Sequence, residues 1–421
     1  MRFRGLFLSV AVLVLAMFSA IGTGSSGEAA PGPAGQEQYV VVLVAGADSH
    51  GAARAAERAQ GVQVLFEYEH ALKGFAFRGS SQAAQALARD PQVQFVSEDR
   101  EVHTTDQSLP TGVQRIGGAS SSTASGNGSG AVNVNVAIID TGIDVAHPDL
   151  NVVGGKNCST GKSYSDGNGH GTHVAGTVAA RDDSTGVVGV APGARLYAVR
   201  VLNNAGSGTW SSVICGIDWV TQNAATIKVA NMSLGGSGAD DGNCGNTNRD
   251  ALHKAICGST AAGVTYVVAA GNDGKDLKGF VPAAYDETIT VTAIADFNGA
   301  SGGGAASTCR SDVDDTAADF SNWATPGSAD AAHTIAAPGV CIRSTWKGGG
   351  YSTISGTSMA SPHVTGTVAL CISSGACTGS AANIRSKLLT DAANRVTAVP
   401  SYGFTGVGDR YYGNLVYTGG Y

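Results

Sequence analysis

The sequence contains little charge and few aromatic residues. Only 14% of its 421 residues are Asp, Glu, Lys or Arg, 6% are aromatic, and the formal net charge is −7. Because no run of Lys or Arg occurs, we expect no nucleic acid or other polyanion as a partner. The 60 glycines and 43% hydrophobic residues are typical of a compact globular protein rather than a disordered chain. A chain of this length predicts at least two folded units.

Long hydrophobic runs are absent except near the N-terminus. Arg2 and Arg4 precede an apolar stretch over residues 6–21, and small or polar residues follow over 22–27. This order is typical of a signal peptide, which we place at residues 1–29. The alternative is a membrane anchor, but the stretch is short for a bilayer span and nothing basic follows it. We therefore expect a secreted, extracellular protein with no membrane partner.

Cysteine is absent before residue 158. Eight cysteines follow, and an even number in a secreted chain predicts disulfide bonds. The count alone leaves many pairings open. Joining near neighbours along the chain pairs Cys244 with Cys257, Cys309 with Cys341 and Cys371 with Cys377, and it leaves Cys158 with Cys215.

The first unit is predicted over residues 38–103 as a small α+β domain without cysteine. Its expected strands are Tyr39–Val44, a segment around Phe75, and Val93–Val96, with a helical Ala/Arg/Glu stretch after the first strand and a second helix near Ala83–Ala88. A polar connector, Thr104–Ser108, follows it.

Beyond the connector, apolar strands alternate with helical segments. This alternation predicts an α/β fold with a mainly parallel sheet covered by helices on both faces. In one helix the spacing of Trp210, Val213, Ile214, Ile217 and Val220 places them on one face. The Ser/Gly-rich segments 119–130 and 299–307 read as solvated loops. The expected strands are Val132–Ile139, Leu196–Leu202, Val229–Leu234, Val264–Ala270 and Ile289–Ile294.

Three short segments contain residues suited to nucleophilic catalysis. Asp140 follows a predicted parallel strand, at the edge where such sheets hold their sites, although an Asp there is more often a local cap. His170 lies among very small residues over 169–177. Ser358, within 355–363, is expected at a helix N-terminus, where developing negative charge is favoured, although a helix cap is the ordinary explanation of one Ser. Together the order Asp, His, Ser is one of the known orders of a catalytic triad.

These segments resemble those of the subtilisin-like serine proteases, and the resemblance runs from about Gln107 to the C-terminus. It implies a three-layer subtilisin-like fold preceded by an inhibitory prodomain of α+β type. It also implies that Asp140 orients the imidazole, that His170 is general base and then acid, and that Ser358 is the nucleophile. The segment 269–272 resembles the oxyanion segment of the family, with the Asn272 amide and the Ser358 backbone N–H as donors.

The resemblance also implies a cleft that binds an extended peptide as an added strand. Residues 205–208 and 233–236 resemble the walls of this cleft, although a glycine turn is the simpler explanation of either segment taken alone. Phe280 departs from the family, because it stands where a small residue is common in the first specificity pocket, and a deep aromatic-accepting pocket is not expected. The implied substrate-binding residues are Gly206, Ser207, Gly208, Ser233, Leu234, Gly235, Ala270, Gly271 and Phe280.

A structural calcium ion is implied by the likeness of residues 179–187 to the calcium loop of the family. Calcium prefers oxygen ligands of mixed type. The implied ligands are side-chain oxygens of Gln107, Asp149 and Asp183 and backbone carbonyls of Arg181, Thr185 and Val187. Asp312, Asp314 and Asp315 are a second acidic group, which we interpret as a solvated loop rather than a metal site.

Three other functions fit the sequence less well than proteolysis does. A non-catalytic binding protein that kept the fold would not need every triad and oxyanion residue. A zinc hydrolase would have to use His147, His170 and His173, whose spacing matches no recognised zinc pattern. An aspartic protease needs two carboxylates that share a proton, and the triplet at 140–142 has no second copy.

The junction of the two units resembles that of prosegment and mature enzyme in the family. It implies a prosegment at 38–105, a peptidase domain at 106–421 and a cut after Thr105, within about two residues. In the cleft, Thr105 would fill the first pocket and Val102 the fourth. We therefore expect a preference for small to medium residues before the cut and an aliphatic residue three positions upstream. The expected partners are protein and peptide substrates and the chain's own prosegment, and we expect a monomer.

Overall fold

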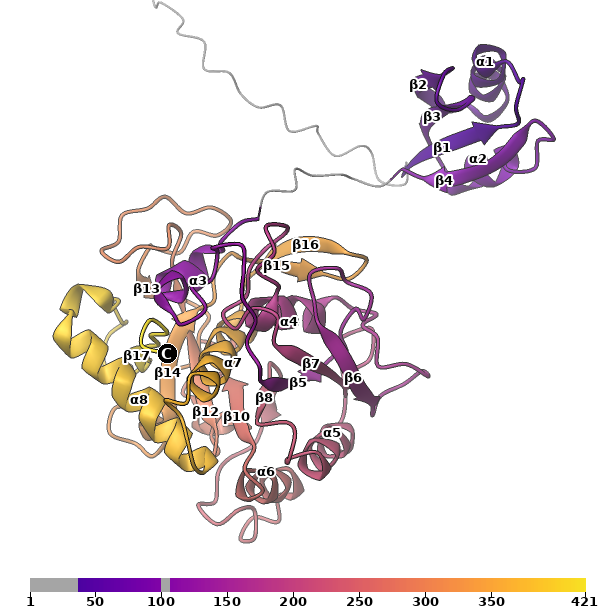
Figure 1. Ribbon diagram of the computed structural model, residues 1–421. Coiled ribbons are helices and arrows are strands. Elements are labelled where there is room, and N and C mark those ends of the chain that lie inside the picture. The colour runs from indigo at the N-terminus through magenta and orange to yellow at the C-terminus, as the bar shows by residue number, and fades with distance from the viewer. Residues whose placement is uncertain (1–36, 100–106) are drawn as a thin grey trace, which may run out of the picture. The chain divides into compact units, whose positions relative to one another are not determined.

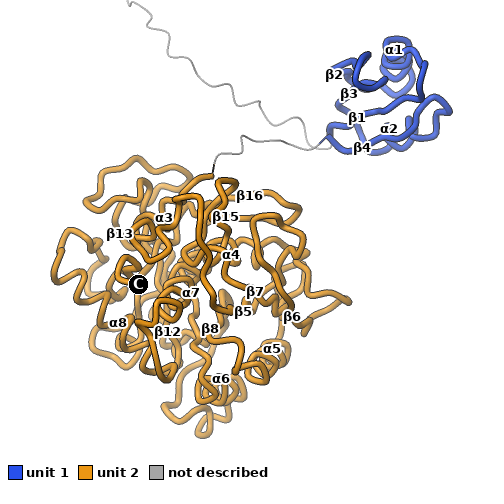
Figure 2. The backbone as a smooth tube through the Cα atoms, in the orientation of Figure 1, with its two compact units in different colours: residues 1–103 blue, residues 104–421 orange. Residues whose placement is uncertain are grey.

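The computed structural model describes residues 37–99 and 107–421. The predictions for the signal peptide at 1–29 and for Val102 and Thr105 fall outside these residues. The chain divides into two compact units, residues 1–103 and 104–421, coloured separately in Figure 2. No helix within the described residues has the length and apolar character needed to cross a membrane.

The first unit is a four-stranded antiparallel sheet with two helices. Its strands lie in the order β2-β3-β1-β4, and Tyr39, Val41, Phe75 and Phe77 form much of its buried core. The strand β2 was not predicted, and the other strands were. Its elements are β1 (Glu37–Leu43), α1 (Ser49–Gln60), β2 (Gln63–Tyr68), β3 (Gly74–Gly79), α2 (Ser81–Leu87) and β4 (Val93–Glu98).

The second unit contains a nine-stranded sheet, two short two-stranded sheets and flanking helices. Its helices are α3 (Thr111–Arg115), η1 (Gly118–Ser120), α4 (His170–Ala179), α5 (Trp210–Gln222), α6 (Ala251–Ala261), η2 (Leu277–Gly279), η3 (Asp330–His333), α7 (Thr357–Ser373), α8 (Ala381–Ala398) and η4 (Pro400–Tyr402). Its strands are β5 (Asn135–Asp140), β6 (Val152–Asn157), β7 (Arg195–Arg200), β8 (Val229–Met232), β9 (Gly236–Ser237), β10 (Thr265–Ala269), β11 (Phe280–Val281), β12 (Ile289–Ala295), β13 (Thr316–Ala317), β14 (Thr334–Pro338), β15 (Ile342–Trp346), β16 (Gly350–Ile354) and β17 (Asn414–Leu415).

The large sheet is mainly parallel, as predicted. Its order is β17-β14-β12-β10-β8-β5-β7-β6, and only the pairing of β13 with β12 is antiparallel. Successive residues of β5 point to opposite faces, so Ile138 packs in the core beneath α4 and α7 while Ile139 packs beneath α5 and α6. Helices thus cover both faces of the sheet (Figure 1), and the predicted α/β architecture is confirmed.

Four disulfide bonds stabilise the second unit, and no cysteine is left free. Their pairing matches the prediction from the sequence. The bonds are Cys158–Cys215, Cys244–Cys257, Cys309–Cys341 and Cys371–Cys377.

Candidate active site

Asp140 and His170 meet at the carboxyl edge of the parallel sheet. Strand β5 ends at Asp140 and helix α4 begins at His170, and Asp140 Oδ1 lies 2.8 Å from His170 Nδ1. The same oxygen accepts a hydrogen bond from the Thr141 amide at 2.7 Å, and Asp140 is fully buried. A carboxylate in this place holds the imidazole with Nδ1 protonated and leaves Nε2 to accept a proton.

The charge state of His170 depends on two opposing effects. Burial lowers the pKa of His170, but attraction by Asp140, its hydrogen bond and a weaker contribution from Asp166 outweigh burial, so that the pKa is raised above its ordinary value. The side chain is 26% exposed, which leaves it open to a substrate.

Asp166 fixes the start of the helix that carries His170. Its Oδ1 accepts hydrogen bonds from the amides of Asn168 and Gly169, and its Oδ2 accepts from the amide and hydroxyl of Thr172. Gly171 has no room for a side chain, because a Cβ there would lie 2.1 Å from the Gly142 carbonyl oxygen. Sequence reasoning did not assign a role to Asp166, although an acidic residue just before a helix is a capping pattern.

Ser358 lies in the first turn of α7, where the helix dipole and free amides favour negative charge. Its hydroxyl donates to the Ser233 carbonyl oxygen at 3.3 Å, and the Ser233 hydroxyl donates to the Ser358 carbonyl at 2.8 Å. Among the described residues no hydrogen bond joins Ser358 to His170. For a proton transfer to His170 the hydroxyl would have to turn away from Ser233, and such contacts are often loose without substrate.

The Asn272 side chain is held by the residue that precedes Ser358. Asn272 Oδ1 accepts hydrogen bonds from the amide and the hydroxyl of Thr357, both at 2.9 Å, and the Thr357 hydroxyl accepts from the Gly271 amide at 3.1 Å. A Cβ on Gly356 would lie 3.7 Å from both Asn272 Nδ2 and the Ser358 amide nitrogen. The two donors therefore border a common space. Sequence reasoning missed the part played by Thr357.

A cleft of about 720 Å³ lies beside His170. It brings together the two segments that sequence reasoning proposed as walls, although they are separated along the chain. Ala270, Gly271 and Phe280 do not line it. The lining residues are Thr141, Asn168, His170, Leu202, Gly206, Ser207, Gly208, Thr209, Trp210, Val213, Ser233, Leu234, Gly235 and Gly236.

Phe280 lies against two glycines next to this cleft. A Cβ on Gly235 would lie 2.4 Å from Phe280 Cε1, and a Cβ on Gly271 would lie 3.0 Å from Phe280 Cδ1. The ring thus occupies space between the cleft wall and the segment that leads to Asn272. Strand β11, which begins with Phe280, pairs with β9 directly after Gly235.

The residues proposed to bind calcium gather around one loop. Gln107 Nε2 lies 2.8 Å from the Arg181 carbonyl oxygen and 3.2 Å from that of Thr185, and Asp183 Oδ1 accepts from the Thr185 amide and hydroxyl. Asp149 Oδ2 accepts from the Val187 amide. Calcium prefers oxygen ligands, and these side chains and carbonyls supply them. Gln107 would do so after its amide group rotates, so that Oε1 replaces Nε2 beside the loop.

Asp149 shows why a cation fits this loop. Its Oδ1 is buried and has no hydrogen-bond partner in the described part of the chain. Burial is the main reason that the pKa of Asp149 is raised to about 6, and its hydrogen bonds only partly oppose this effect. A cation beside Oδ1 would supply the missing partner, so the residues present fit the implied metal.

The three histidines considered for a zinc hydrolase do not form a cluster of ligands among the described residues. His147 Nε2 lies 2.9 Å from the Gly350 carbonyl oxygen, and His173 Nε2 lies 2.9 Å from that of Ile342. Burial lowers the pKa of His173 to about 3. Both rings are thus engaged by the backbone as neutral side chains.

The prediction that Asp312, Asp314 and Asp315 form a solvated loop is wrong. Asp314 and Asp315 are only 4% and 7% exposed. Asp314 accepts hydrogen bonds from the amides of Phe297 and Ala305, and Asp315 Oδ1 lies 2.8 Å from the buried guanidinium of Arg115. The carboxylates are buried because backbone amides and one arginine satisfy them.

The prediction of a solvated loop over residues 119–130 is also only partly right. Ser121 and Ser125 are buried, and the Asp182 carboxylate accepts hydrogen bonds from the amides of Gly126 and Gly128 at 2.8 Å. The Asp182 carboxylate thus binds residues 126–128 to the segment that follows helix α4.

A buried carboxylate hydrogen-bonded to an imidazole, together with a serine in the first turn of a helix, provides the residue types that a serine hydrolase uses. Residues 131–413 match the model of the subtilase family, and residues 38–105 match that of peptidase inhibitor I9. The chain therefore belongs to the subtilase family and is a serine endopeptidase with an inhibitory prodomain, which implies a zymogen.

Known proteins are similar over most of the chain. Subtilisin E of Bacillus subtilis is 37% identical over 89% of this chain and 90% of its own length. Subtilisin DY of Bacillus licheniformis is 43% identical over 68% of this chain and 93% of its own length. A solved structure of a cold adapted subtilisin-like serine proteinase is 33% identical, with a TM-score of 0.54. The match covers 73% of this chain and 97% of the chain in that structure.

Proposed function

We propose that Asp140, His170 and Ser358 form the catalytic triad of this endopeptidase. The observation that carries the proposal is the 2.8 Å contact between Asp140 and His170. His170 lines a cleft that is also lined by Ser233, the hydrogen-bond partner of Ser358. Asn272 Nδ2 and the Ser358 amide border a space next to this serine, where an oxyanion would form.

The reaction proceeds in two halves. Ser358 Oγ attacks the scissile carbonyl carbon while His170 Nε2 takes its proton, and Asp140 stabilises the resulting imidazolium. Asn272 Nδ2 and the Ser358 amide donate to the oxyanion. His170 then gives the proton to the leaving amine, the C–N bond breaks, and an acyl-enzyme remains. Water attacks this ester by the same route and regenerates Ser358.

Ser358→Ala tests the triad. The variant should lose proteolysis and labelling by a serine-directed reagent while keeping the unfolding midpoint of the parent. Ser361→Ala is a matched control, because Ser361 lies in the same helix and hydrogen-bonds Asn231 instead. A Ser358→Ala protein that still cleaves peptides well above the uncatalysed rate would show that the assignment is wrong.

The substrate is proposed to lie extended between 206–208 and 233–235 and to bind through main-chain hydrogen bonds. Phe280, packed against Gly235 and Gly271, narrows the space for the side chain before the cut, so small to medium residues are preferred there. A cleavage profile of a mixed peptide library, read by mass spectrometry, tests this preference. A profile dominated by large aromatic residues before the cut would contradict it.

The domain limits are proposed as a signal peptide at 1–29, a prosegment at 38–105 and a peptidase domain at 106–421. The four disulfide bonds favour an oxidising compartment and hence secretion. N-terminal sequencing of the secreted protein should find a start close to Asp106, and a start far from it would refute the proposed junction.

A calcium ion is proposed between Gln107, Asp149 and the 181–187 loop. When bound, the ion would neutralise buried carboxylate charge and tie the start of the peptidase domain to this loop. The orphaned Asp149 Oδ1 supports the proposal.

A further inference from the structure

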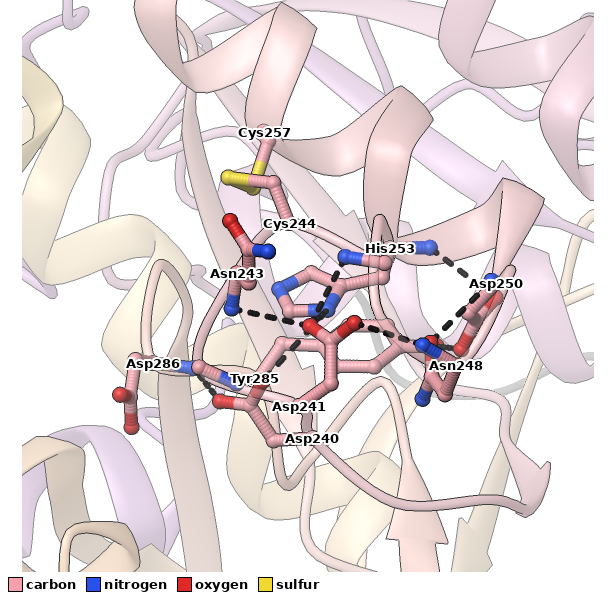
Figure 3. A network of polar contacts seen from close by, with 12 residues as sticks. Asp240, Asp241, Asn243, Cys244, Asn248, Asp250, His253, Cys257, Tyr285 and Asp286 are labelled. Atoms are coloured by element: carbon pink, nitrogen blue, oxygen red, sulfur yellow. Dashed lines mark hydrogen bonds and ion pairs between the residues drawn. A yellow bond between two sulfur atoms is a disulfide. The ribbon is translucent and has the colours of Figure 1, made fainter.

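A second group of metal-ligand side chains lies away from the proposed triad. It occupies the loop between β9 and α6 and the first turn of α6, beside the Cys244–Cys257 disulfide (Figure 3). Asp240, Asp241 and His253 each offer a ligand atom, and these three atoms lie within 4.8 Å of one another. Neither the proposed mechanism nor the proposed calcium loop uses these residues.

His253 is the central residue of this group. Its side chain is fully buried, it stacks on the Tyr285 ring with centroids 4.1 Å apart, and its Nε2 lies 2.9 Å from Glu287 Oε2. Because a carboxylate only accepts, Nε2 is the donor. The other nitrogen, Nδ1, faces Asp240 and Asp241 (Figure 3), and within residues 37–99 and 107–421 it has no hydrogen-bond partner.

A cation between His253 and the two aspartates would remove an electrostatic conflict in this arrangement. With Nε2 donating to Glu287, a neutral imidazole points the lone pair of Nδ1 at two carboxylates, which repel it. A proton on Nδ1 would remove the repulsion, but an imidazolium draws a carboxylate to about 2.7–2.9 Å. The Nδ1 atom lies instead 3.4 Å from Asp240 Oδ1 and 3.4 Å from Asp241 Oδ1. The gap is too wide for a charge-assisted hydrogen bond.

The same 3.4 Å separations suit a shared metal ion. Zinc binds imidazole nitrogen and carboxylate oxygen at about 2.0–2.2 Å, and the edge of such a tetrahedron is about 3.3–3.6 Å. Calcium with six ligands would give a similar edge, but calcium takes oxygen ligands, and imidazole favours zinc and related transition ions. A histidine that binds a metal almost always donates its other N–H to a carboxylate, a backbone carbonyl or water, and His253 donates to the Glu287 carboxylate.

The two aspartates contribute differently. Asp241 accepts four backbone amides, from Asn243, Gly245, Thr247 and Asn248, which fix its carboxylate in the loop with Oδ1 toward His253, so Asp241 is the weaker of the two carboxylate ligands. Within the described part of the chain, Asp240 Oδ1 accepts one hydrogen bond, from the Gly242 amide, and keeps a lone pair for a metal. The Asp240 side chain is 16% exposed, which gives an ion and a water ligand access from solvent.

We propose that His253 Nδ1, Asp240 and Asp241 bind one zinc-type divalent ion, with water in the fourth position and Glu287 orienting the imidazole. The ion would bind the 238–250 loop to helix α6. The Asp286 amide donates to Asp240 Oδ2 at 3.2 Å. The ion would therefore also restrain the segment that follows Phe280. The loop that would hold the ion follows directly after β9, whose Gly236 lines the cleft.

Zinc titration of the full chain tests this inference. The chain carries Ser358→Ala to prevent autolysis, and excess calcium fills oxygen-ligand sites. Calorimetry should show one zinc equivalent, and X-ray absorption should show nitrogen and oxygen ligands at about 2.0–2.2 Å. Zinc should also raise the unfolding midpoint, which is a readout independent of proteolysis.

Variants locate the ion. His253→Gln and Asp240→Asn should weaken zinc binding by more than the roughly 10–100-fold that loss of an outer partner costs, and Glu287→Gln should fall within that range. Asp240→Asn keeps the acceptor for the Gly242 amide, so it is expected to fold even if His253→Gln does not.

His333→Gln is the matched control, because His333 is another buried histidine, 3.7 Å from Asp286, outside the ligand set. It should bind zinc as the parent does. The proposal is overturned if the parent binds no zinc under these conditions, or if Asp240→Asn binds zinc with the affinity of the parent.

Discussion

The Thr357 hydroxyl offers a sharp test of how Asn272, the proposed oxyanion donor, is held. It donates to Asn272 Oδ1 and accepts from the Gly271 amide, and Thr357→Val removes both hydrogen bonds without changing the size of the side chain. Each is worth about 0.5–1.5 kcal/mol. Because the Thr357 amide still holds Asn272 Oδ1, we expect about 1–2 kcal/mol of lost transition-state stabilisation.

That loss corresponds to a decrease in kcat of about 5–30-fold, with KM nearly unchanged because the proposed role of Asn272 Nδ2 is to donate to the oxyanion of the transition state. Asn272→Ala should cost more, about 10²–10³-fold, a magnitude established with an enzyme of this family. Thr357→Ser, which keeps the hydroxyl, is the control and should stay near the parent. Initial rates on a peptide anilide, calibrated by active-site titration, measure each value.

A double-mutant cycle separates positioning from a purely structural role. If Thr357 acts through Asn272, adding Thr357→Val to Asn272→Ala should lower kcat by no more than about twofold. A further decrease of about 5–30-fold in the double variant would refute the reasoning, because Thr357 would then act by another route.

Four further outcomes are expected. The value of kcat/KM should fall as the pH drops through the raised pKa of His170, because the base works only when neutral, and a midpoint below 6.5 in the pH profile would contradict this. Phe280→Ala should raise kcat/KM for a Phe substrate relative to an Ala substrate in the same peptide series. Chelation of calcium should lower the unfolding midpoint, and Asp149→Asn should reduce this effect in scanning calorimetry. Arg115→Met should cost about 3–5 kcal/mol in denaturant unfolding, because it leaves the buried Asp315 carboxylate without its cation.

The architecture could be predicted because it depends on local patterns. Buried parallel strands are continuous apolar runs, and helices between them imply crossover connections. The strand β2 was missed because its sequence mixes polar and apolar residues. It lies at the edge of its sheet and pairs with β3 alone in that sheet.

Contacts between distant segments were harder to predict. Asp314 and Asp315 look like a surface loop in the sequence, since nothing nearby shows that Arg115, about 200 residues earlier, lies against one of them. Likewise, the adjacent aspartates of the β9–α6 loop look solvated until the fold brings Glu287 to the far side of His253. Burial of charge is decided by partners that the linear order does not reveal.

All four disulfide bonds join cysteines at or beyond residue 158, and the inhibitor-like segment at 38–105 contains none. One peptide connection is therefore the only covalent tether between inhibitor and enzyme. While it is intact, the inhibitor acts at an effective concentration that a short linker sets at about the millimolar level. Once the connection is cut, inhibition depends on the actual concentration of both pieces. Dilution of the two pieces then becomes an activating step.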